Sequence, residues 1–209
     1  MVNKSLYIIQ SYRYFFLNGN VEMYKIKSLS VFCGSADGKN PRYVQDAVKL
    51  GKILAESGIR LIYGAGHVGM MGAVAKGALD NGGTVVGIIN TLLQDREEQI
   101  FELSELKILP SLHTRKDAML EASDAFCVLP GGIGTLDEIF EVMTLKQLGE
   151  LNKPIIMYNA DGFWEPLRKM IDSLVAAGYV RPEHAKLLTY VDRIEDILPT
   201  VESEISARG

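Results

Sequence analysis

From residue 28 onward, short apolar runs alternate with longer segments in which apolar residues recur at helical spacing, and this alternation limits the fold more than any other feature. The middle runs are apolar at every position, as is typical of strands that are buried on both faces of a sheet. Repeated strand–helix units of this kind form right-handed crossovers and a parallel sheet. The expected strands are LSVFC (29–33), RLIYG (60–64), TVVGII (84–89), LKILP (106–110), AFCVLP (125–130), PIIMYN (154–159) and LLTYV (187–191).

Four of the intervals hold clear helical segments, and a glycine follows each of these four, as is common at a helix C-terminus. The pattern therefore predicts a Rossmann-like, doubly wound α/β fold, with a mostly parallel sheet of about seven strands and helices on both faces. We expect residues 23–209 to form this single domain. Residues 1–22 precede a second methionine, and we interpret them as a dispensable extension. The expected helices are 42–57, 69–81, 135–148 and 163–177, and the third carries Leu136, Ile139, Phe140, Met143 and Leu148 at helical spacing.

Composition excludes several classes of protein. The 209-residue chain has a formal net charge of −4, whereas nucleic-acid binders usually carry a strong basic excess, so we expect no nucleic-acid partner. The apolar patch near the N-terminus is too interrupted by polar residues for a membrane span. The two cysteines and three histidines lack metal-ligand spacing, so we expect no metal site. Both cysteines lie in apolar strand runs, which favours a reduced, cytoplasmic protein, although their pairing stays open.

Three glycine-bearing turns come directly after strands: CGSADG (33–38), YGAGHVGMMG (63–72) and PGGIGT (130–135). In a doubly wound sheet such turns meet at one edge, where ligands bind at the point at which strand order reverses. Glycine is also common in tight turns for structural reasons alone, but three such turns together favour a ligand crevice. We include Ser35 from the first turn and Gly66 from the second among the candidate substrate-binding residues.

Two familiar nucleotide-binding patterns fit poorly. The Walker pattern is absent, so no lysine is aimed at a β- or γ-phosphate in that way. GAGHVG (64–69) matches the dinucleotide pattern, but Asn90 stands at the end of the next strand, where an acidic residue would bind the ribose. A dinucleotide site is therefore a weak alternative.

The third turn suits a single phosphate group. Gly131, Gly132 and Gly134 would let backbone N–H groups approach an anion at the start of a helix, and Thr135 would add a hydroxyl. The alternative is structural. Thr135 and Glu138 also fit a capping box, in which both side chains serve only the first turn of the helix.

Two cations precede this loop. HTRKDAM (113–119) places Arg115 and Lys116 at the start of the helical segment before the 125–130 strand. A guanidinium there could pair with a phosphate or a carboxylate. An ordinary solvated helix start is the alternative, but cations in a first helical turn oppose the helix dipole, which favours another reason for their presence.

These segments, together with SDAFCVLPGGIGTLDEIFEVMTLKQLG (123–149) and NKPIIMYNADGFWEPL (152–167), resemble the LONELY GUY family of cytokinin riboside 5′-monophosphate phosphoribohydrolases. The family hallmark PGGxGTxxE reads here as 130–138, and the resemblance runs from about residue 28 to about residue 198. It implies hydrolysis of the N-glycosidic bond of an AMP-like nucleotide, with or without a substituent on N6. The reaction would release a free adenine-type base and ribose 5-phosphate and would need no cofactor. Members have been labelled lysine decarboxylases, but no segment resembles a pyridoxal phosphate site, so we do not expect that activity.

The resemblance also implies roles for individual residues. The family's catalytic arginine and glutamate fall on Arg115 and Glu138, and we expect Glu138 in the first turn of its helix. There its carboxylate would stabilise positive charge on the ribose and accept a proton from the attacking water. The phosphate loop falls on 131–135. The further substrate contacts that the resemblance implies are Glu97, Lys116, Asp137 and Thr144.

Departures from the family leave alternatives open. Ala65 stands where relatives often have glycine, and this change is conservative in size. Leu145 stands where tryptophan is frequent, which could reshape a dimer contact or the base pocket and leaves the base preference open between AMP, N6-substituted AMP and a pyrimidine nucleotide. The competing function is a non-catalytic carrier of a nucleotide or of the molybdenum cofactor, which needs the glycine turns but not the Arg115 and Glu138 pair. Relatives commonly form homodimers, and we expect the helix that includes 143–149 at the interface, although its apolar residues also suit a buried helix.

Overall fold

The computed structural model of the chain describes residues 26–94 and 102–207, together with the backbone of four short strands near the N-terminus. These strands form two antiparallel pairs, β1 (Ile8–Ile9) with β2 (Tyr12–Arg13) and β3 (Phe15–Leu17) with β4 (Asn20–Glu22). Glu97 lies outside the described residues, so its role stays a prediction. The dispensability of residues 1–22 stays a prediction as well.

A seven-stranded sheet forms the centre of the structure, and its neighbouring strands all pair in parallel. The strand order is β11-β10-β9-β5-β6-β7-β8, so the order reverses between β5 and β9. This finding confirms the predicted doubly wound α/β fold. The strands are β5 (Ser28–Phe32), β6 (Arg60–Tyr63), β7 (Val85–Asn90), β8 (Glu105–Leu109), β9 (Ala125–Val128), β10 (Ile155–Tyr158) and β11 (Thr189–Val191).

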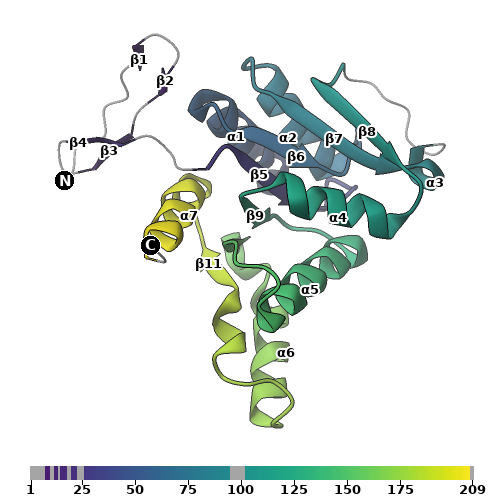
Figure 1. The fold of residues 1–209 in the computed structure, drawn as a ribbon, viewed down its shortest axis with the longest axis vertical. Helices are drawn as coiled ribbons and strands as arrows, with labels where there is room; N and C mark the ends of the chain where they lie inside the picture. The colour runs from purple at the N-terminus through teal and green to yellow at the C-terminus, as the bar shows by residue number, and fades with distance from the viewer. Residues whose placement is uncertain are drawn as a thin grey trace.

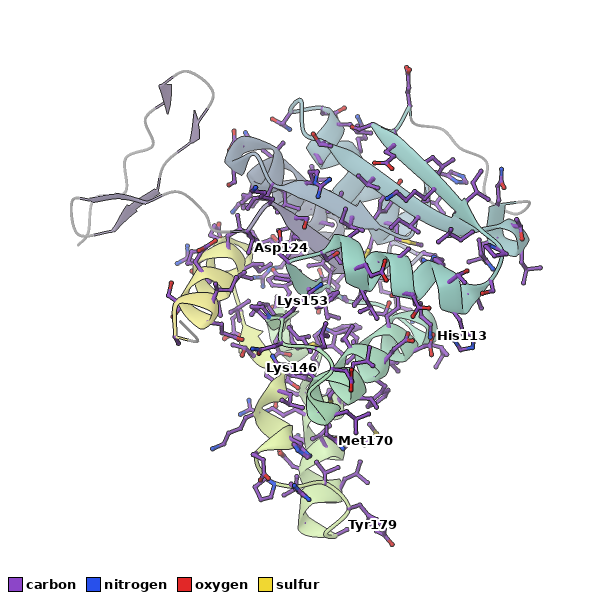
Figure 2. The ribbon with its side chains drawn as sticks, in the orientation of Figure 1. His113, Asp124, Lys146, Lys153, Met170 and Tyr179 are labelled. Atoms are coloured by element: carbon purple, nitrogen blue, oxygen red, sulfur yellow. The ribbon has the colours of Figure 1, made fainter. Side chains whose placement is uncertain are left out.

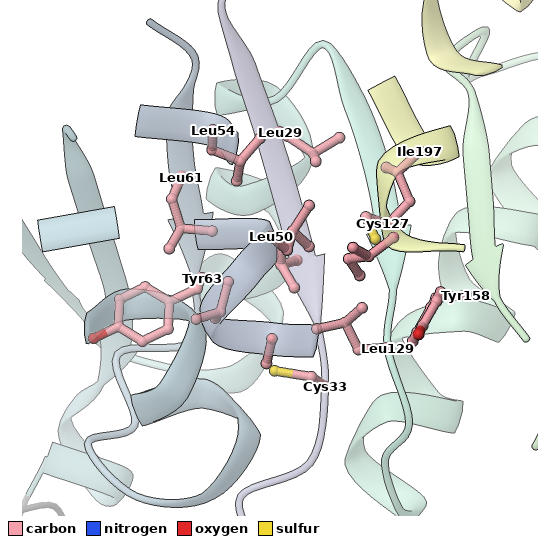
Figure 3. Packing of buried hydrophobic residues seen from close by; sticks show 14 of the residues in the cluster. Leu29, Cys33, Leu50, Leu54, Leu61, Tyr63, Cys127, Leu129, Tyr158 and Ile197 are labelled. Carbon is pink, nitrogen blue, oxygen red and sulfur yellow. The ribbon is translucent and has the colours of Figure 1, made fainter. Parts of the chain in front are cut away.

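Helices cover both faces of the sheet (Figure 1), and each face has its own apolar core. Successive residues of a strand point to opposite faces, so Val31 and Cys33 join one core while Phe32 joins the other. Figure 3 shows the first core, where Leu50 and Leu54 pack with residues of the central strands. The first core is covered by α1 (Pro41–Ser57), α2 (Gly69–Leu79) and α7 (Ile197–Ser206), and the second by α4 (Leu112–Ala122), α5 (Ile133–Leu148) and α6 (Glu165–Ala176).

Short helical elements complete the fold. They are α3 (Thr91–Gln94) after β7 and the 3-10 turns η1 (Ala160–Gly162), η2 (His184–Leu187) and η3 (Ile194–Asp196). Figure 2 shows that α6 extends away from the sheet, with Met170 and Tyr179 on the outside of this arm. Both side chains are exposed, Tyr179 by 86%.

α1 and α2 pack in close contact because each presents a glycine to the other. A Cβ atom on Gly51 would lie 2.1 Å from the carbonyl oxygen of Val74, and one on Gly77 would lie 2.2 Å from that of Val48. Interiors are packed too densely to absorb such an overlap. The close contact therefore holds the two turns that precede α1 and α2 side by side at one edge of the sheet.

Candidate active site

The candidate site lies at the edge where the parallel strands end and where α3, α4 and α5 begin (Figure 1). The reversal of strand order places the turn after β5 beside the turn after β9, and the N–H of Gly34 donates to the carbonyl oxygen of Pro130 at 3.1 Å. A cavity of about 260 Å³ opens at this point, so the predicted residues Ser35, Gly131 and Gly132 share one wall. The lining is Gly34, Ser35, Ala36, Asp37, Gly38, Lys39, Tyr43, Met70, Pro130, Gly131, Gly132 and Phe163.

The glycine loop presents the start of α5 to an anion. Gly132 is the N-cap of α5, and no side chain of the described residues caps this terminus. A Cβ on Gly131 would lie 2.2 Å from Oγ1 of the buried Thr135 and 2.9 Å from the nitrogen of Gly34, so only glycine fits there. Gly132 and Gly134 are exposed and have open space where a side chain would stand. The N–H groups of the first turn can therefore be approached closely.

The capping-box alternative for this helix is wrong. α5 begins at Ile133, so Thr135 is the third helical residue instead of the N-cap. Glu138 is correspondingly in the second turn, which corrects the expectation of the first. The physical reason is that Gly132 can itself serve as N-cap, since glycine accepts the required backbone conformation at little cost. The capping box occurs instead at the start of α4, between Ser111 and Thr114.

Arg115 of α4 and Glu138 of α5 lie close to each other, although neither is among the residues that line the cavity. The Nε of Arg115 donates to the carbonyl oxygen of Ile88 in β7 at 3.0 Å, and its Nη2 lies 3.6 Å from Oε1 of Glu138. The two side chains are only 10% and 12% exposed. Burial raises the pKa of Glu138 to about 7, and the charge of Arg115 opposes that rise only in part. A carboxyl group that titrates near neutral pH is suited to both accept and donate a proton.

Lys116 lies between two carboxylates of α5. Its Nζ is 3.0 Å from Oδ2 of Asp137 and 2.7 Å from Oε2 of Glu141. Burial lowers the pKa of Lys116, but the hydrogen bonds to Glu141 and Asp137 outweigh burial and raise it. The structure thus brings the predicted residues Lys116 and Asp137 together. Glu141 was not among the predicted residues, although its spacing of three residues from Glu138 was an available signal.

Thr144 is not brought to the pair. It lies on the exposed face of α5, and its Oγ1 donates to the carbonyl oxygen of Phe140 in the same helix at 2.6 Å. Phe140 and Leu148 lie on this face as well and are 38% and 66% exposed, whereas Ile139 and Met143 of the same apolar pattern are buried. Gly66 lies against Met71, since a Cβ there would stand 2.5 Å from Cε of Met71. The three atoms nearest to such a Cβ all belong to Met71.

The two cysteines do not form a disulfide. Cys33 and Cys127 are both free and buried, which answers the question left open by the sequence, and burial raises the pKa of both thiols.

Within residues 26–94 and 102–207, no cluster of three or more histidine, cysteine or acidic side chains could hold a metal ion. No helix in the described part of the chain is long and apolar enough to cross a membrane.

Comparison with known proteins relates this geometry to a family. Residues 71–201 match the protein family described as "Possible lysine decarboxylase". The chain is 38% identical to a probable cytokinin riboside 5′-monophosphate phosphoribohydrolase of Oryza sativa subsp. japonica, over 88% of this chain and 84% of the relative. It is 39% identical to a cytokinin riboside 5′-monophosphate phosphoribohydrolase of Rhodococcoides fascians, over 85% of this chain and 90% of the relative.

Solved structures share the fold. The molybdenum cofactor carrier protein of Chlamydomonas reinhardtii superposes with a TM-score of 0.66 at 20% identity, over 86% of this chain and 98% of the carrier. The molybdenum cofactor binding protein of Rippkaea orientalis superposes with a TM-score of 0.63 at 18% identity, over 85% of this chain and 96% of that protein. At these identities the likeness establishes the architecture alone.

Proposed function

Because the chain belongs to the family of cytokinin riboside 5′-monophosphate phosphoribohydrolases, and is therefore a hydrolase of the N-glycosidic bond of nucleotides, we propose that Arg115 and Glu138 are its catalytic residues. The substrates are AMP-like nucleoside 5′-monophosphates with a substituent on N6. The products are the free adenine-type base, a cytokinin, and ribose 5-phosphate. The observation that carries the proposal is the nearly buried ion pair of Arg115 and Glu138 at the end of the sheet, on helices that flank the glycine loop.

The 5′-phosphate binds at the start of α5. Its charge is favoured by the N–H groups and the positive end of this helix, and the glycines of the 131–134 loop leave room for it. Ser35 and Thr135 supply hydroxyl groups beside that loop. Glu138 lies farther along the same rigid helix, so an anchored phosphate also fixes the ribose relative to the carboxylate. Binding energy from the phosphate is thereby used to orient the reacting bond.

Glu138 then acts at C1′. Positive charge develops on the ribose as the bond to the base breaks, and the ionised carboxylate of Glu138 stabilises that charge. A water oxygen bonds to C1′ and gives a proton to Glu138, while the electron pair of the broken bond leaves with the base. The base takes up a proton from solvent, and Glu138 releases its proton to solvent, which restores the ionised carboxylate. The pKa of Glu138 of about 7 populates both forms of the carboxyl near neutral pH. Arg115 favours and orients the ionised form.

Lys116 is a further candidate contact of the phosphate. In the structure it is held by Asp137 and Glu141, so it would exchange one carboxylate for the phosphate when the substrate binds. Asp137 would then be released to the ribose hydroxyls. Glu97 and Gly66 complete the proposed substrate contacts from the sequence pattern.

An apolar rim around this edge favours an apolar N6 substituent. Val68, Leu92, Leu112 and Ile133 follow β6, β7, β8 and β9, respectively, and they are between 46% and 82% exposed. Large apolar side chains gathered at a ligand-binding edge are a common basis for binding apolar groups. A prenylated AMP should therefore be preferred to AMP.

The exposed face of α5 supports a homodimer. Ile133, Phe140 and Leu148 recur on this face, with Asp137 and Thr144 between them. An antiparallel crossing of two α5 helices near Phe140 would set Leu148 of one copy against Ile133 of the other and Thr144 against Asp137. This contact would bring Thr144 to the glycine loop of the second copy.

Phe140→Asp should yield monomers in sedimentation experiments, and an unchanged dimer would reject this interface.

The remaining proposals concern the cellular compartment of the protein and its partners. A cytoplasmic location fits the free thiols of Cys33 and Cys127, because a reducing compartment maintains such thiols. The net charge of −4 argues against a nucleic-acid partner.

Free-base release tests the function directly. Wild type, Arg115→Ala, Glu138→Gln and the surface control Glu150→Gln are incubated with AMP, isopentenyl-AMP and CMP, and free base is followed by chromatography alongside thermal melts. Base release by wild type and by the control, but not by the two site variants, supports the proposal. Wild type that releases no base, yet melts at a higher temperature with AMP, would indicate the nucleotide carrier instead.

A further inference from the structure

The guanidinium of Arg115 lies across the end of β6. The pairing of β6 with β7 extends to Tyr63 and Gly87, and the next residue of β7, Ile88, accepts the hydrogen bond from Nε of Arg115. This bond aims the rest of the guanidinium over Gly64, the first residue after β6. A Cβ atom on Gly64 would lie 2.2 Å from Nη2 of Arg115, 3.2 Å from Sδ of Met71 and 3.4 Å from Cζ of Arg115, so only the contact with Nη2 is a severe overlap. The Nη2 atom is also the one that faces Glu138.

We propose that Gly64 is a positioning residue for catalysis, because the missing side chain is what lets the Arg115 guanidinium lie at the end of β6 and reach Glu138. The inference rests on the proposed catalytic role of that pair. It deepens the site by assigning a specific purpose to the second glycine turn, which contributes no charged group of its own.

Backbone conformation does not explain this glycine. Gly64 is not among the described residues with a positive φ, so an L side chain is compatible with its backbone. Its neighbour Ala65 does have a positive φ of 63°, and the chain nevertheless carries a methyl group there. Glycine is thus absent where the backbone would favour it and present where Arg115 needs the space.

Gly64→Ala should separate activity from stability. The atom in the way is the far end of a flexible side chain, so the fold should persist while the guanidinium moves aside. A displacement of about 1 Å in a catalytic group can lower the rate about 100-fold, and we expect a loss of that order in kcat/KM. Glu138 would also lose its nearby positive charge, so its pKa should rise further. The acidic limb of the pH profile of kcat/KM should therefore move to higher pH.

A double-mutant cycle identifies the partner of Gly64. Arg115→Lys keeps a positive charge but ends before the position of Nη2. If Gly64 acts through Arg115, Gly64→Ala should change kcat/KM by no more than about twofold in the Arg115→Lys background. Ala65→Gly is the matched control, because it changes one methyl group in the same turn at a position whose φ of 63° suits glycine, and it should retain kcat/KM within about twofold.

Each outcome decides for or against the inference. Wild-type kcat/KM and an unmoved pH profile in Gly64→Ala would overturn it, as would an equal loss in the Arg115→Lys background. If Gly64→Ala fails to fold, restored folding in the double variant supports the steric relation, and continued failure overturns it. Wild type that releases no base would refute the proposed function instead, while the melts of these variants would still report the contact between Gly64 and Arg115.

Discussion

Glu138→Gln should make the protein more stable than wild type at pH 8 while abolishing hydrolysis. Burial raises the pKa of Glu138 from an ordinary value of 4.5 to about 7. A group with a raised pKa in the folded state binds its proton more tightly there, so its contribution to stability is complete below about pH 4.5. That contribution is lost progressively as the pH rises through about 7. Glutamine resembles the protonated carboxyl in shape and does not ionise, so the variant avoids the loss.

The size of the expected stability difference follows from the pKa shift of Glu138. The difference between 4.5 and about 7, at about 1.4 kcal/mol per pKa unit, corresponds to about 3 kcal/mol in the free energy of unfolding. The side chain is 12% exposed, so solvent screens little of this energy. For a chain of this length the same difference corresponds to a rise in Tm of roughly 6–12 °C at pH 8.

Urea unfolding at a series of pH values from 5 to 8.5 measures the effect. The single tryptophan, Trp164, is buried and reports unfolding by its fluorescence. The stability difference between Glu138→Gln and wild type should grow with pH up to about 7 and then level off, whereas the exposed-site control Glu150→Gln should show no such growth. A difference that does not depend on pH, or a wild type that gains on the variant as the pH rises, would refute the reasoning. The first result would mean that Arg115 fully offsets the burial penalty on the carboxylate, and the second that Arg115 outweighs it.

Three further substitutions test a buried hydroxyl group, a helix–helix contact and a helix N-cap. Ser30→Ala should raise Tm by roughly 2–4 °C, because the buried Oγ of Ser30 has no hydrogen-bond partner among the described residues; a lower Tm would contradict this. Gly51→Ala should lower the free energy of unfolding by about 3 kcal/mol in urea titrations, since its Cβ would overlap the carbonyl oxygen of Val74, and a stable variant would show that α1 and α2 can separate. Asn40→Ala should cost about 1 kcal/mol in thermal melts, because it removes the N-cap that accepts from the N–H of Arg42, and an unchanged melt would mean that the cap is dispensable.

The regular elements were predictable because their causes are local. A strand buried on both faces must be apolar throughout, so the run at 125–130 located β9 to within two residues. The segment 42–57 located α1 to within one residue, with Gly58 in the left-handed conformation at its end. The same local logic found the glycine loop and the adjacent cations Arg115 and Lys116.

The start of α5 shows where local logic fails. Thr135 and Glu138 have the spacing of a capping box, and the pattern by itself cannot exclude that arrangement. Gly132 begins the helix earlier in the structure and leaves Glu138 facing Arg115. A flexible glycine loop permits more than one helix start, and tertiary contacts decide among them.

The sequence by itself therefore determined the α/β architecture, the sheet edge at which the turns meet and the residue types available there, because periodicity and glycine placement act over a few residues. Only the tertiary structure decided how those residues pair. The contact of Lys116 with Asp137 joins positions 21 residues apart, and the 3.6 Å approach of Arg115 to Glu138 depends on how α4 and α5 pack on the same face of the sheet. The pKa of Glu138 depends on burial, which the whole packed edge creates. Such distances and degrees of burial arise from the assembled fold, so a local sequence pattern cannot predict them.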